Sequence, residues 1–492
     1  MLPRAPLFAL LGLAGTGYAS PFDKASSLSD CLLASEVPVS APGTADWKLD
    51  AAPFNLRLNF TPVAIAVPRN AKHVQDAVAC AAKLGIKANA KCGGHSYASF
   101  GLGGEDGHLT IEMDRMNKVV LDNTTGIATV EGGSRLGHVA WELYQQGKRG
   151  FSHGTCPGVG VGGHALHGGY GVSSHTKGLA LDWLVGATVV LANSTIVNVS
   201  KTENPDLFWA LRGAGASFGV VTEFRFDTFE VPEKVTYFVA PVQWPTEARA
   251  LVGVRAVQEF AQNMPKELNM RLFIASRFVN LEGLYYGDKA GLQAALEPLR
   301  KITNATLAMA TTGGWLDQIK HFGNGVNIDQ GHGYNMQETF YSTSLYTKAL
   351  SEEKLQNFVS YWFQQAKSNK RDWYVHIDLH GGKNSAVSAV GEDEASYAHR
   401  DFLFMYLFYD RVDKGVYPVD GHTYMSNFAR NITEGLAQEE WGRYVNYPDS
   451  RLDQASAQTN YWGKNLARLQ AIKKEVDPDD VFHYPQGVVP AA

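Results

Sequence analysis

The chain has 492 residues, of which 45% are hydrophobic and 19% charged, with a formal net charge of −5. This length accommodates two or three domain-sized units, each with its own core. No run of basic residues occurs, so the composition gives no indication of a nucleic-acid or other polyanionic partner. We therefore expect an ordinary globular protein with a near-neutral surface.

The N-terminus has the layout of a secretory signal peptide. Arg4 precedes an apolar run from Leu7 to Leu13, and small residues end near Ala19. The run is too short to span a bilayer, so we expect residues 1–19 to be removed and the protein to be secreted without a membrane anchor. Six Asn-x-Ser/Thr sequons predict N-glycans at Asn59, Asn123, Asn193, Asn198, Asn304 and Asn431.

Secretion permits disulfides, and the chain has four cysteines. No CxxC pair occurs, so a zinc or redox motif is not expected. Because Cys92 and Cys156 both lie in glycine-rich loops, we predict that Cys31 pairs with Cys80.

The first half of the chain predicts short strands and amphipathic helices. Residues 62–90 read as strand, helix, strand, with Val74, Ala77 and Val78 on one helical face and Gly85 at the helix end. Further elements follow as strands at 108–113, 118–122 and 127–132, a helix at 136–147, a β-hairpin at 184–200 and a helix at 204–215.

After about Val231 the pattern changes. Alternating or aromatic strands are predicted at 271–278, 372–380 and 401–410, together with a helix at 354–367. These elements predict a second domain built on an antiparallel sheet with helices on one face, and hence an α+β protein. The segment 461–482 predicts a helix followed by a turn.

Two short motifs point to other enzymes, but their surroundings argue against both. Gly158, Gly160 and Gly163 spell G-x-G-x-x-G, yet no strand directly precedes them and the glycine-rich continuation does not predict a helix, as a dinucleotide site requires. GASFG at 215–219 matches the nucleophile elbow, but a helix precedes it and a strand follows, the reverse of the hydrolase order.

The strand at 372–380 has two different faces. One carries Trp373, Val375, Ile377 and Leu379, and the other carries Tyr374, His376, Asp378 and His380. The span from His376 to His380 is about 13 Å on a strand, so one metal ion cannot bind all three polar residues, although a pair stays open. This second face is either solvated or a cleft wall, where a carboxylate can act as a base or orient one.

Two glycine-rich loops each present one nucleophile. Residues 151–171 include eight glycines and Cys156, and residues 91–104 place His95 among glycines. Bare backbone lets N–H groups approach a phosphate or a flat ring closely. The pair of loops suggests one large cofactor fixed at two points; on residue types alone, two ordinary turns with a buried histidine and cysteine remain the alternative.

Several segments together resemble the flavin oxidoreductases of the berberine-bridge-enzyme type, within the vanillyl-alcohol-oxidase fold. They include PVAIAVPRNAKHVQDAV, KCGGHSYASFG and GTCPGVGVGG, and the similarity covers nearly the whole mature chain. YVNYPDS and HGGKNSAVSAVGEDEASYAHRD are more narrowly similar to the fungal oligosaccharide oxidases. The resemblance implies a PCMH-type FAD-binding domain at 20–232, an antiparallel-sheet substrate-binding domain at 233–449, and a C-terminal segment at 450–492 that returns to the FAD domain.

For the cofactor, the resemblance implies bicovalent FAD, with His95 on the 8α-methyl group and Cys156 on C6. Tyr170 would lie near the ring, and further contacts would come from Gly93, Gly94, Ser96, Gly158, Gly160, Gly162 and Gly163. Cys92 and His167 depart from the family pattern, which has glycine at the first position and often at the second. Val159 is small enough to leave a path for oxygen.

For the reaction, Tyr447 matches the family's catalytic tyrosine and Asp378 its partner carboxylate, which we expect to lower the cost of ionising Tyr447. The anomeric hydroxyl of a reducing-end oligosaccharide would be oxidised to a lactone, and dioxygen reduced to hydrogen peroxide.

The positions that match family residues near the sugar are Tyr97, Phe273, Tyr374, His376 and Leu407. Because two of these positions are apolar here, we expect xylo-oligosaccharides to be favoured over cello-oligosaccharides. No metal is predicted. The alternatives are an alcohol or alkaloid oxidase of the same fold and, more distantly, a non-enzymatic carbohydrate-binding protein.

Overall fold

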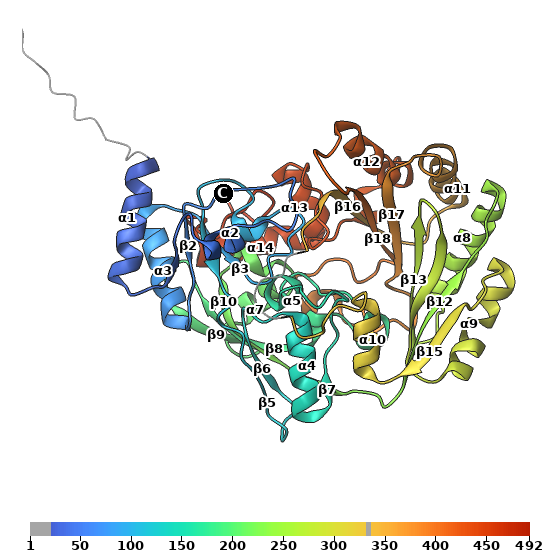
Figure 1. Ribbon diagram of the computed structural model, residues 1–492, viewed down its shortest axis with the longest axis horizontal. Helices are drawn as coiled ribbons and strands as arrows, with labels where there is room; N and C mark the ends of the chain where they lie inside the picture. Colours follow the sequence, from blue (N-terminus) through green and yellow to red (C-terminus); the bar gives the residue numbers. More distant parts are fainter. Residues whose placement is uncertain (1–20, 331–335) are drawn as a thin grey trace, which may run out of the picture.

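The computed structural model describes residues 21–330 and 336–492, so the predicted signal peptide lies outside the described residues. In these ranges, three sheets of four or more strands organise the chain. Two of them, with their helices, form the part that contains the N-terminal half, and the third forms the part opposite (Figure 1).

The four-stranded sheet is a small parallel unit with one antiparallel edge strand. Its order is β1 (Val39–Ser40), β2 (Ala64–Ala66), β4 (Leu109–Glu112) and β3 (Ala88–Lys91), with β2 and β3 parallel to β4. Helix α3 (Ala71–Leu84) connects β2 to β3 and ends at Gly85, as predicted, where the backbone is left-handed. The predicted disulfide Cys31–Cys80 is confirmed, and it ties α1 (Pro21–Ala34) to α3.

The five-stranded sheet is antiparallel. Its order is β5 (Val119–Leu121), β6 (Ala128–Glu131), β10 (Val220–Phe226), β8 (Leu184–Val190) and β9 (Ile196–Ser200). The predicted β8–β9 hairpin and the predicted helices α4 (Leu136–Gly147) and α7 (Pro205–Ala214) are confirmed. Helix α7 precedes β10, which is the reverse of a nucleophile elbow.

The eight-stranded antiparallel sheet forms the other part of the molecule. Its order is β15 (Met309–Gly313), β12 (Val235–Pro241), β14 (Val279–Tyr285), β13 (Leu268–Ala275), β17 (Asp372–Leu379), β18 (Phe404–Val412), β16 (Thr339–Thr347) and β19 (Trp441–Gly442). The prediction of a long antiparallel sheet in this half is confirmed.

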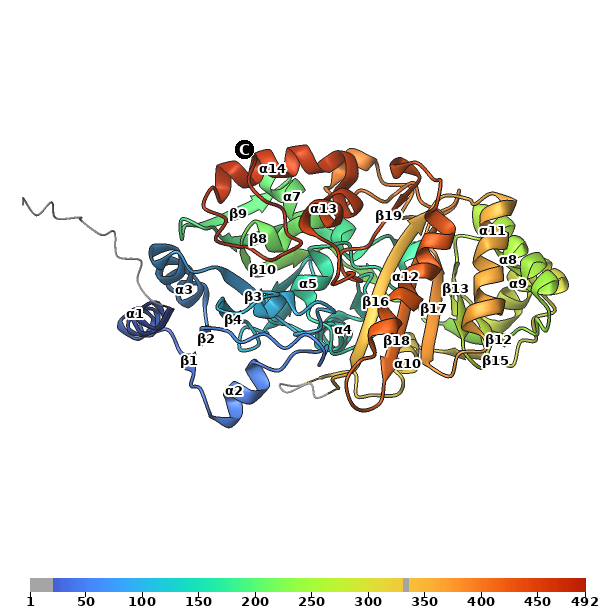
Figure 2. The ribbon, with the colours of Figure 1, turned by 90° about the horizontal axis from the view of Figure 1, so that it is seen from above.

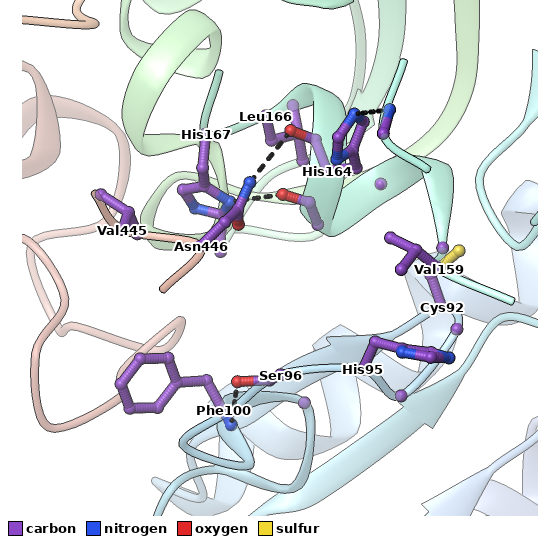
Figure 3. Close-up of a pocket in the computed structure, with 18 of the residues that line it drawn as sticks. Cys92, His95, Ser96, Phe100, Val159, His164, Leu166, His167, Val445 and Asn446 are labelled. Carbon is purple, nitrogen blue, oxygen red and sulfur yellow. Dashed lines mark hydrogen bonds between the residues drawn. The ribbon is translucent and has the colours of Figure 1, made fainter. Parts of the chain in front are cut away.

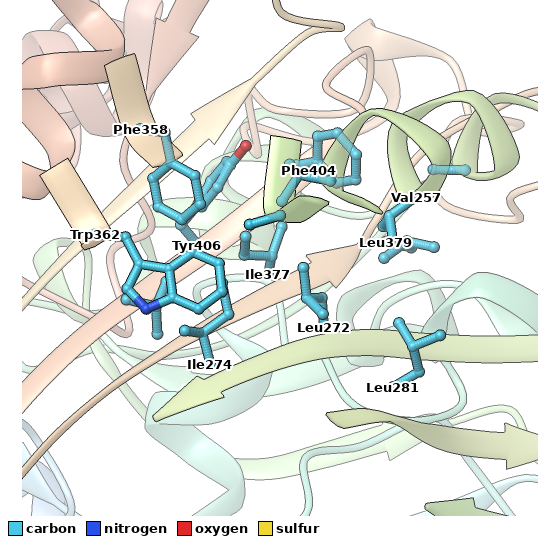
Figure 4. Close-up of a cluster of buried hydrophobic side chains, with 14 of the residues drawn as sticks. Val257, Leu272, Ile274, Leu281, Phe358, Trp362, Ile377, Leu379, Phe404 and Tyr406 are labelled. Carbon is cyan, nitrogen blue, oxygen red and sulfur yellow. The ribbon is translucent and has the colours of Figure 1, made fainter. Parts of the chain in front are cut away.

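Helices cover one face of this sheet, as predicted. They are α8 (Glu247–Gln262), α9 (Lys289–Thr303), α11 (Glu352–Tyr361) and α12 (Val419–Thr433) (Figure 2). Between them and the strands lies a hydrophobic core, to which β17 contributes Ile377 and Leu379, and Trp362, the residue after α11, also belongs to it (Figure 4). The shorter α10 (Trp315–Phe322) packs on the opposite face, against Val235 and Leu284.

The C-terminal segment returns to the N-terminal half. Helices α13 (Gln454–Trp462) and α14 (Leu466–Val476) follow the large sheet, and α14 packs against α7. The ammonium of the fully buried Lys473 donates to the carbonyl of Ser217, 2.7 Å away, and forms an ion pair with Asp477. This polar contact fixes the tail against the segment that joins α7 to β10.

Two local features were not predicted from the sequence. A short helix, α5 (Val161–Ala165), begins inside the G-x-G-x-x-G motif, because Val161 and Ala165 are fully buried in the core and this packing outweighs the low helix propensity of glycine, whereas the continuation to residue 171 is not helical beyond Ala165. Asn204 does not cap α7 with its side chain, which instead donates to the carbonyl of Asn198.

The exposed surface carries five of the six sequon asparagines, whereas Asn431 is half-buried and its side-chain amide donates to the carbonyl of Asn427. Within the ranges that the structure describes, no helix is long and apolar enough to cross a membrane.

Candidate functional site

Two glycine loops from different sheets meet backbone to backbone. One follows β3 and carries Gly93, and the other leads into α5 and carries Gly160. A Cβ atom at Gly93 would lie 2.2 Å from the nitrogen of Gly160, and a Cβ at Gly160 would lie 2.2 Å from the nitrogen of Gly93. Neither position therefore accepts a side chain, and the two loops are held at backbone contact distance.

The start of α4 connects the two loops. The carbonyl of Ser134 accepts a hydrogen bond from Val161 N at 2.9 Å, and Leu136 N donates to the carbonyl of Val159 at 2.8 Å. Arg135 Nη1 donates to the carbonyls of Gly93, at 2.9 Å, and Gly158, at 2.5 Å.

His95 and Cys156 line the same cavity, one from each loop. The ring of His95 stacks on Phe54 with 4.5 Å between centroids. Burial, assisted by the charge of Arg135, lowers the pKa of His95 to about 3. The imidazole is therefore neutral at physiological pH and retains a nucleophilic lone pair.

The cavity runs between the two glycine loops. His95, Ser96 and Phe100 lie on one side, His164, Leu166 and His167 lie on the other, and Val445 and Asn446 come from a third segment (Figure 3). The predicted site residues that line it are Gly93, Gly94, His95, Ser96, Tyr97, Cys156, Gly160, Gly162, Gly163, Tyr170, Asp378 and Tyr447. Gly158 does not line it; its carbonyl points to Arg135 instead.

Asp378 reaches this cavity from β17, and Arg271 reaches it from β13. The two residues are direct partners in the β13–β17 register, so their side chains lie on the same face of the sheet. Arg271 Nε donates to Glu282 on β14 at 2.7 Å. Sequence reasoning missed Arg271; its only signal was its place on the same alternating face as Phe273.

Burial raises the pKa of Asp378 from 3.8 to about 7, while Arg271 opposes the shift. Burial also raises the pKa of Tyr447 well above 10, and the negative charge of Asp378 raises it further. The expectation that Asp378 lowers the cost of ionising Tyr447 was therefore wrong, because two nearby negative charges repel each other. The positive charge that lowers the pKa of Tyr447 belongs to Arg271.

Tyr447 stands on a segment that is anchored to the second glycine loop. The Tyr444 hydroxyl accepts hydrogen bonds from Gly169 N, at 2.9 Å, and Tyr170 N, at 3.3 Å. Asn446 donates to the carbonyl of His164 at 3.3 Å. The ring of Tyr447 stacks on Tyr97 with 5.7 Å between centroids, so both loops contribute to its position.

Three of the five residues predicted near the sugar form one row across three strands. Phe273 of β13, His376 of β17 and Leu407 of β18 are partners in register. Tyr374 stacks on His376, with 4.8 Å between centroids. None of these four lines the cavity itself, but His376 Nδ1 lies 3.4 Å from the guanidinium of Arg271, which does.

His380, at the end of the same strand, uses both ring nitrogens within the protein. Nδ1 donates to the carbonyl of Phe402, and Nε2 accepts from the Tyr397 hydroxyl. Among the described residues, no group of three His, Cys, Asp or Glu side chains is placed to hold a metal ion.

The two departures from the family pattern are both accommodated. The thiol of Cys92 donates to the carbonyl of Ser134, and burial raises its pKa to about 11, which makes it a poor nucleophile. The ring of His167 donates from Nδ1 to the carbonyl of Gly163, at 2.8 Å.

Comparisons with known proteins show the family to which the chain belongs. A family model described as "FAD binding domain" matches residues 62–200, and one described as "Berberine and berberine like" matches residues 443–489. A xylooligosaccharide oxidase from Thermothelomyces thermophilus is 50% identical over 479 residues, which cover 96% of each chain. The chain belongs to the berberine-bridge-enzyme-like FAD-linked oxidoreductases.

Solved structures give the same result. The xylooligosaccharide oxidase from Myceliophthora thermophila in complex with xylobiose has a TM-score of 0.93 and 49% identity, over 95% of this chain and 100% of that one. Glucooligosaccharide oxidase from Acremonium strictum, whose structure was solved to study its 6-S-cysteinyl, 8α-N1-histidyl FAD, has a TM-score of 0.92 and 44% identity. The match covers 95% of this chain and 100% of that one. The expected fold is confirmed, and the protein is an FAD-dependent oxidoreductase of the oligosaccharide oxidase group.

Because the two loops touch at Gly160, we expect alanine substitutions at two glycines of the same loop to differ in their effect on folding stability. Gly160→Ala places a methyl group against backbone atoms and should cost about 1–3 kcal/mol or more of folding stability. Gly163→Ala is the matched control, because a Cβ there meets nothing within 4 Å. Denaturant unfolding measures both variants. Equal stability of the two would contradict the proposed contact.

Because Asp378 is buried, we expect the folding stability of the protein to depend on pH. The pKa of Asp378 is higher in the folded protein than in the unfolded chain. Its protonated form therefore contributes fully to folding stability below about pH 4, and this contribution is lost as the pH rises through about 7. A shift of this size corresponds to about 4 kcal/mol. Asp378→Asn should therefore be more stable than the unchanged protein at about pH 8 and show no such gain at about pH 4. Urea unfolding across this range checks it; a pH-independent difference would refute it.

Proposed function

We propose that this protein is a secreted oxidase that oxidises the C1 hydroxyl of reducing-end oligosaccharides to the lactone and passes the electrons to dioxygen, forming hydrogen peroxide. The observation that carries the proposal is that His95, Cys156, Asp378, Tyr447 and Arg271 all line one cavity. Nucleophiles for attaching a flavin and groups for moving a proton thus share one space.

FAD fits this site on the chemistry of its donors. His95 and Cys156 would bond to the ring, in the same way as the 6-S-cysteinyl, 8α-N1-histidyl FAD of glucooligosaccharide oxidase. Gly163 lines the cavity and a Cβ there would meet nothing within 4 Å, so the wall at this position leaves room for a flat group. When bound, the flavin supplies the hydride acceptor.

The protein's own part in the reaction is proton transfer. Tyr447 takes the proton of the anomeric hydroxyl, and its own phenolic proton passes towards Asp378. Asp378 therefore acts as a proton acceptor and not through its charge, which by itself opposes ionisation of Tyr447. Because the pKa of Asp378 is about 7, the carboxylate is available at neutral and higher pH. Arg271, paired with Glu282, holds a positive charge beside both groups.

We propose that xylo-oligosaccharides are preferred to cello-oligosaccharides. Phe273 and Leu407 offer no hydrogen bond to a hydroxymethyl group, which a glucosyl unit carries and a xylosyl unit lacks. A buried hydroxyl without a partner costs about 1–3 kcal/mol. The neighbouring His376 stays uncharged, because burial and Arg271 lower its pKa well below 6.5. The relative whose structure contains xylobiose supports this assignment.

The remaining assignments follow the same proposal. Residues 20–232 and 450–492 bind FAD, residues 233–449 bind the sugar, and residues 1–19 direct secretion. N-glycans are placed at the exposed sequons Asn59, Asn123, Asn193, Asn198 and Asn304, and at the half-buried Asn431.

Replacing the proposed base tests the mechanism. In Tyr447→Phe, kcat for xylobiose oxidation should fall by about 100- to 10,000-fold, while flavin content stays unchanged. Oxygen consumption and peroxide formation measure the reaction. Tyr361→Phe is the control, since the Tyr361 hydroxyl donates to the carbonyl of Tyr424 in the helix layer. Full activity of Tyr447→Phe would remove Tyr447 from the mechanism.

The sugar preference is tested by comparing kcat/KM for xylobiose and cellobiose. We expect xylobiose to be favoured by about 5- to 150-fold, which corresponds to the cost of one unpaired hydroxyl, about 1–3 kcal/mol. Phe273→Gln should reduce the preference, because an amide can pair with the hydroxymethyl group. A tenfold preference for cellobiose in the unchanged protein would contradict the assignment, at about 1.4 kcal/mol in the wrong direction.

A further inference from the structure

Arg135 joins the two loops that carry His95 and Cys156. Its Nη1 atom donates one hydrogen bond to the carbonyl of Gly93, at 2.9 Å, and another to the carbonyl of Gly158, at 2.5 Å. Gly93 is two residues before His95, and Gly158 is two residues after Cys156. One guanidinium nitrogen therefore links the backbones beside both nucleophiles.

The arginine itself is fixed to a rigid element. It is the residue before α4, and Leu136, Val139 and Leu143 of that helix are fully buried. The backbone of Arg135 also forms an antiparallel bridge with Gly160. The Cys156 loop is thus tied to α4 by backbone as well as by the guanidinium. The His95 loop has fewer such ties: besides the Gly93–Gly160 contact, the thiol of Cys92 donates to the carbonyl of Ser134.

The positive charge of Arg135 also favours flavin attachment, because it helps to keep the imidazole of His95 uncharged. After burial, it is the next cause that lowers the pKa of His95, to about 3. A neutral imidazole has the lone pair that bond formation to carbon requires, whereas a protonated one does not.

We propose that Arg135 is the positioning residue for flavin attachment: it holds His95 and Cys156 at the separation at which both reach one flavin ring. The inference rests on the proposed function, because it presupposes a doubly attached FAD.

Each attachment replaces one flavin hydrogen by a bond to the protein, from C8α to a nitrogen of His95 and from C6 to the sulfur of Cys156. The hydrogen lost by the flavin and that lost by the side chain leave as protons, while two electrons remain on the ring. Dioxygen takes up these electrons with two protons and becomes hydrogen peroxide. Arg135 forms no covalent bond in these steps. It acts by fixing the distance between the reacting atoms, and a misplacement of about 1 Å can lower the rate of such reactions by about 100-fold.

The test is to quantify flavin-bearing peptides by mass spectrometry after proteolysis of the purified holoprotein. In the unchanged protein, one species should join the His95 and Cys156 peptides through the flavin. In Arg135→Met, bound FAD should persist while this doubly linked fraction falls by about tenfold or more. Arg135→Lys, which keeps a charge and a donor on a shorter side chain, should give an intermediate fraction.

Arg225→Met is the matched control. Arg225 is also half-buried in the same half of the protein, and it donates to the carbonyl of Ala187 at 3.2 Å, away from both loops. It should keep the full doubly linked fraction at a thermal stability similar to that of Arg135→Met. An unchanged doubly linked fraction in Arg135→Met would overturn the inference, as would an equal loss in Arg225→Met. Absence of covalent flavin from the unchanged protein would instead overturn the proposed function.

Discussion

The approach of two glycine backbones organises the site. Gly93 and Gly160 touch with no space for a Cβ on either, so the loops that carry His95 and Cys156 occupy one fixed relative position. These loops belong to different units of the fold: one follows β3 of the parallel sheet, and the other leads into α5. A cofactor attached to both would join the two units covalently. The glycines are thus required for proximity and not only for flexibility.

The large sheet supplies the other wall of the cavity, and its two faces have different surroundings. On β17, Ile377 faces the core beneath the helices, while Asp378 faces the cavity. Burial makes this carboxyl easier to protonate, and Arg271 beside it limits that effect. The alternation of side chains along β17 places Asp378 in the cavity, and Arg271 lies beside it. Together they give the site a proton acceptor that works near neutral pH.

Local pattern sufficed to predict many elements. The α3 helix, the β8–β9 hairpin and the two-faced strand β17 follow from periodicity, and His95 and Cys156 stood out because glycines surround them. The role of Arg271 could not be predicted, because its pairing with Asp378 depends on the register between two distant strands. Helix α5 was missed for a related reason: tertiary burial of Val161 overrides the propensity of its glycines. The expected effect of Asp378 on Tyr447 had the wrong sign, because a negative carboxylate beside the phenol opposes a second negative charge there.

The central claim is that His95 and Cys156 hold the flavin covalently on two adjoining loops. The most direct measurement is the visible absorption spectrum of the pellet and supernatant after acid precipitation of the purified protein. We expect the yellow colour to stay with the pellet, and to move to the supernatant only when His95→Ala and Cys156→Ala are combined. A colourless pellet from the unchanged protein, with free FAD in solution, would contradict it.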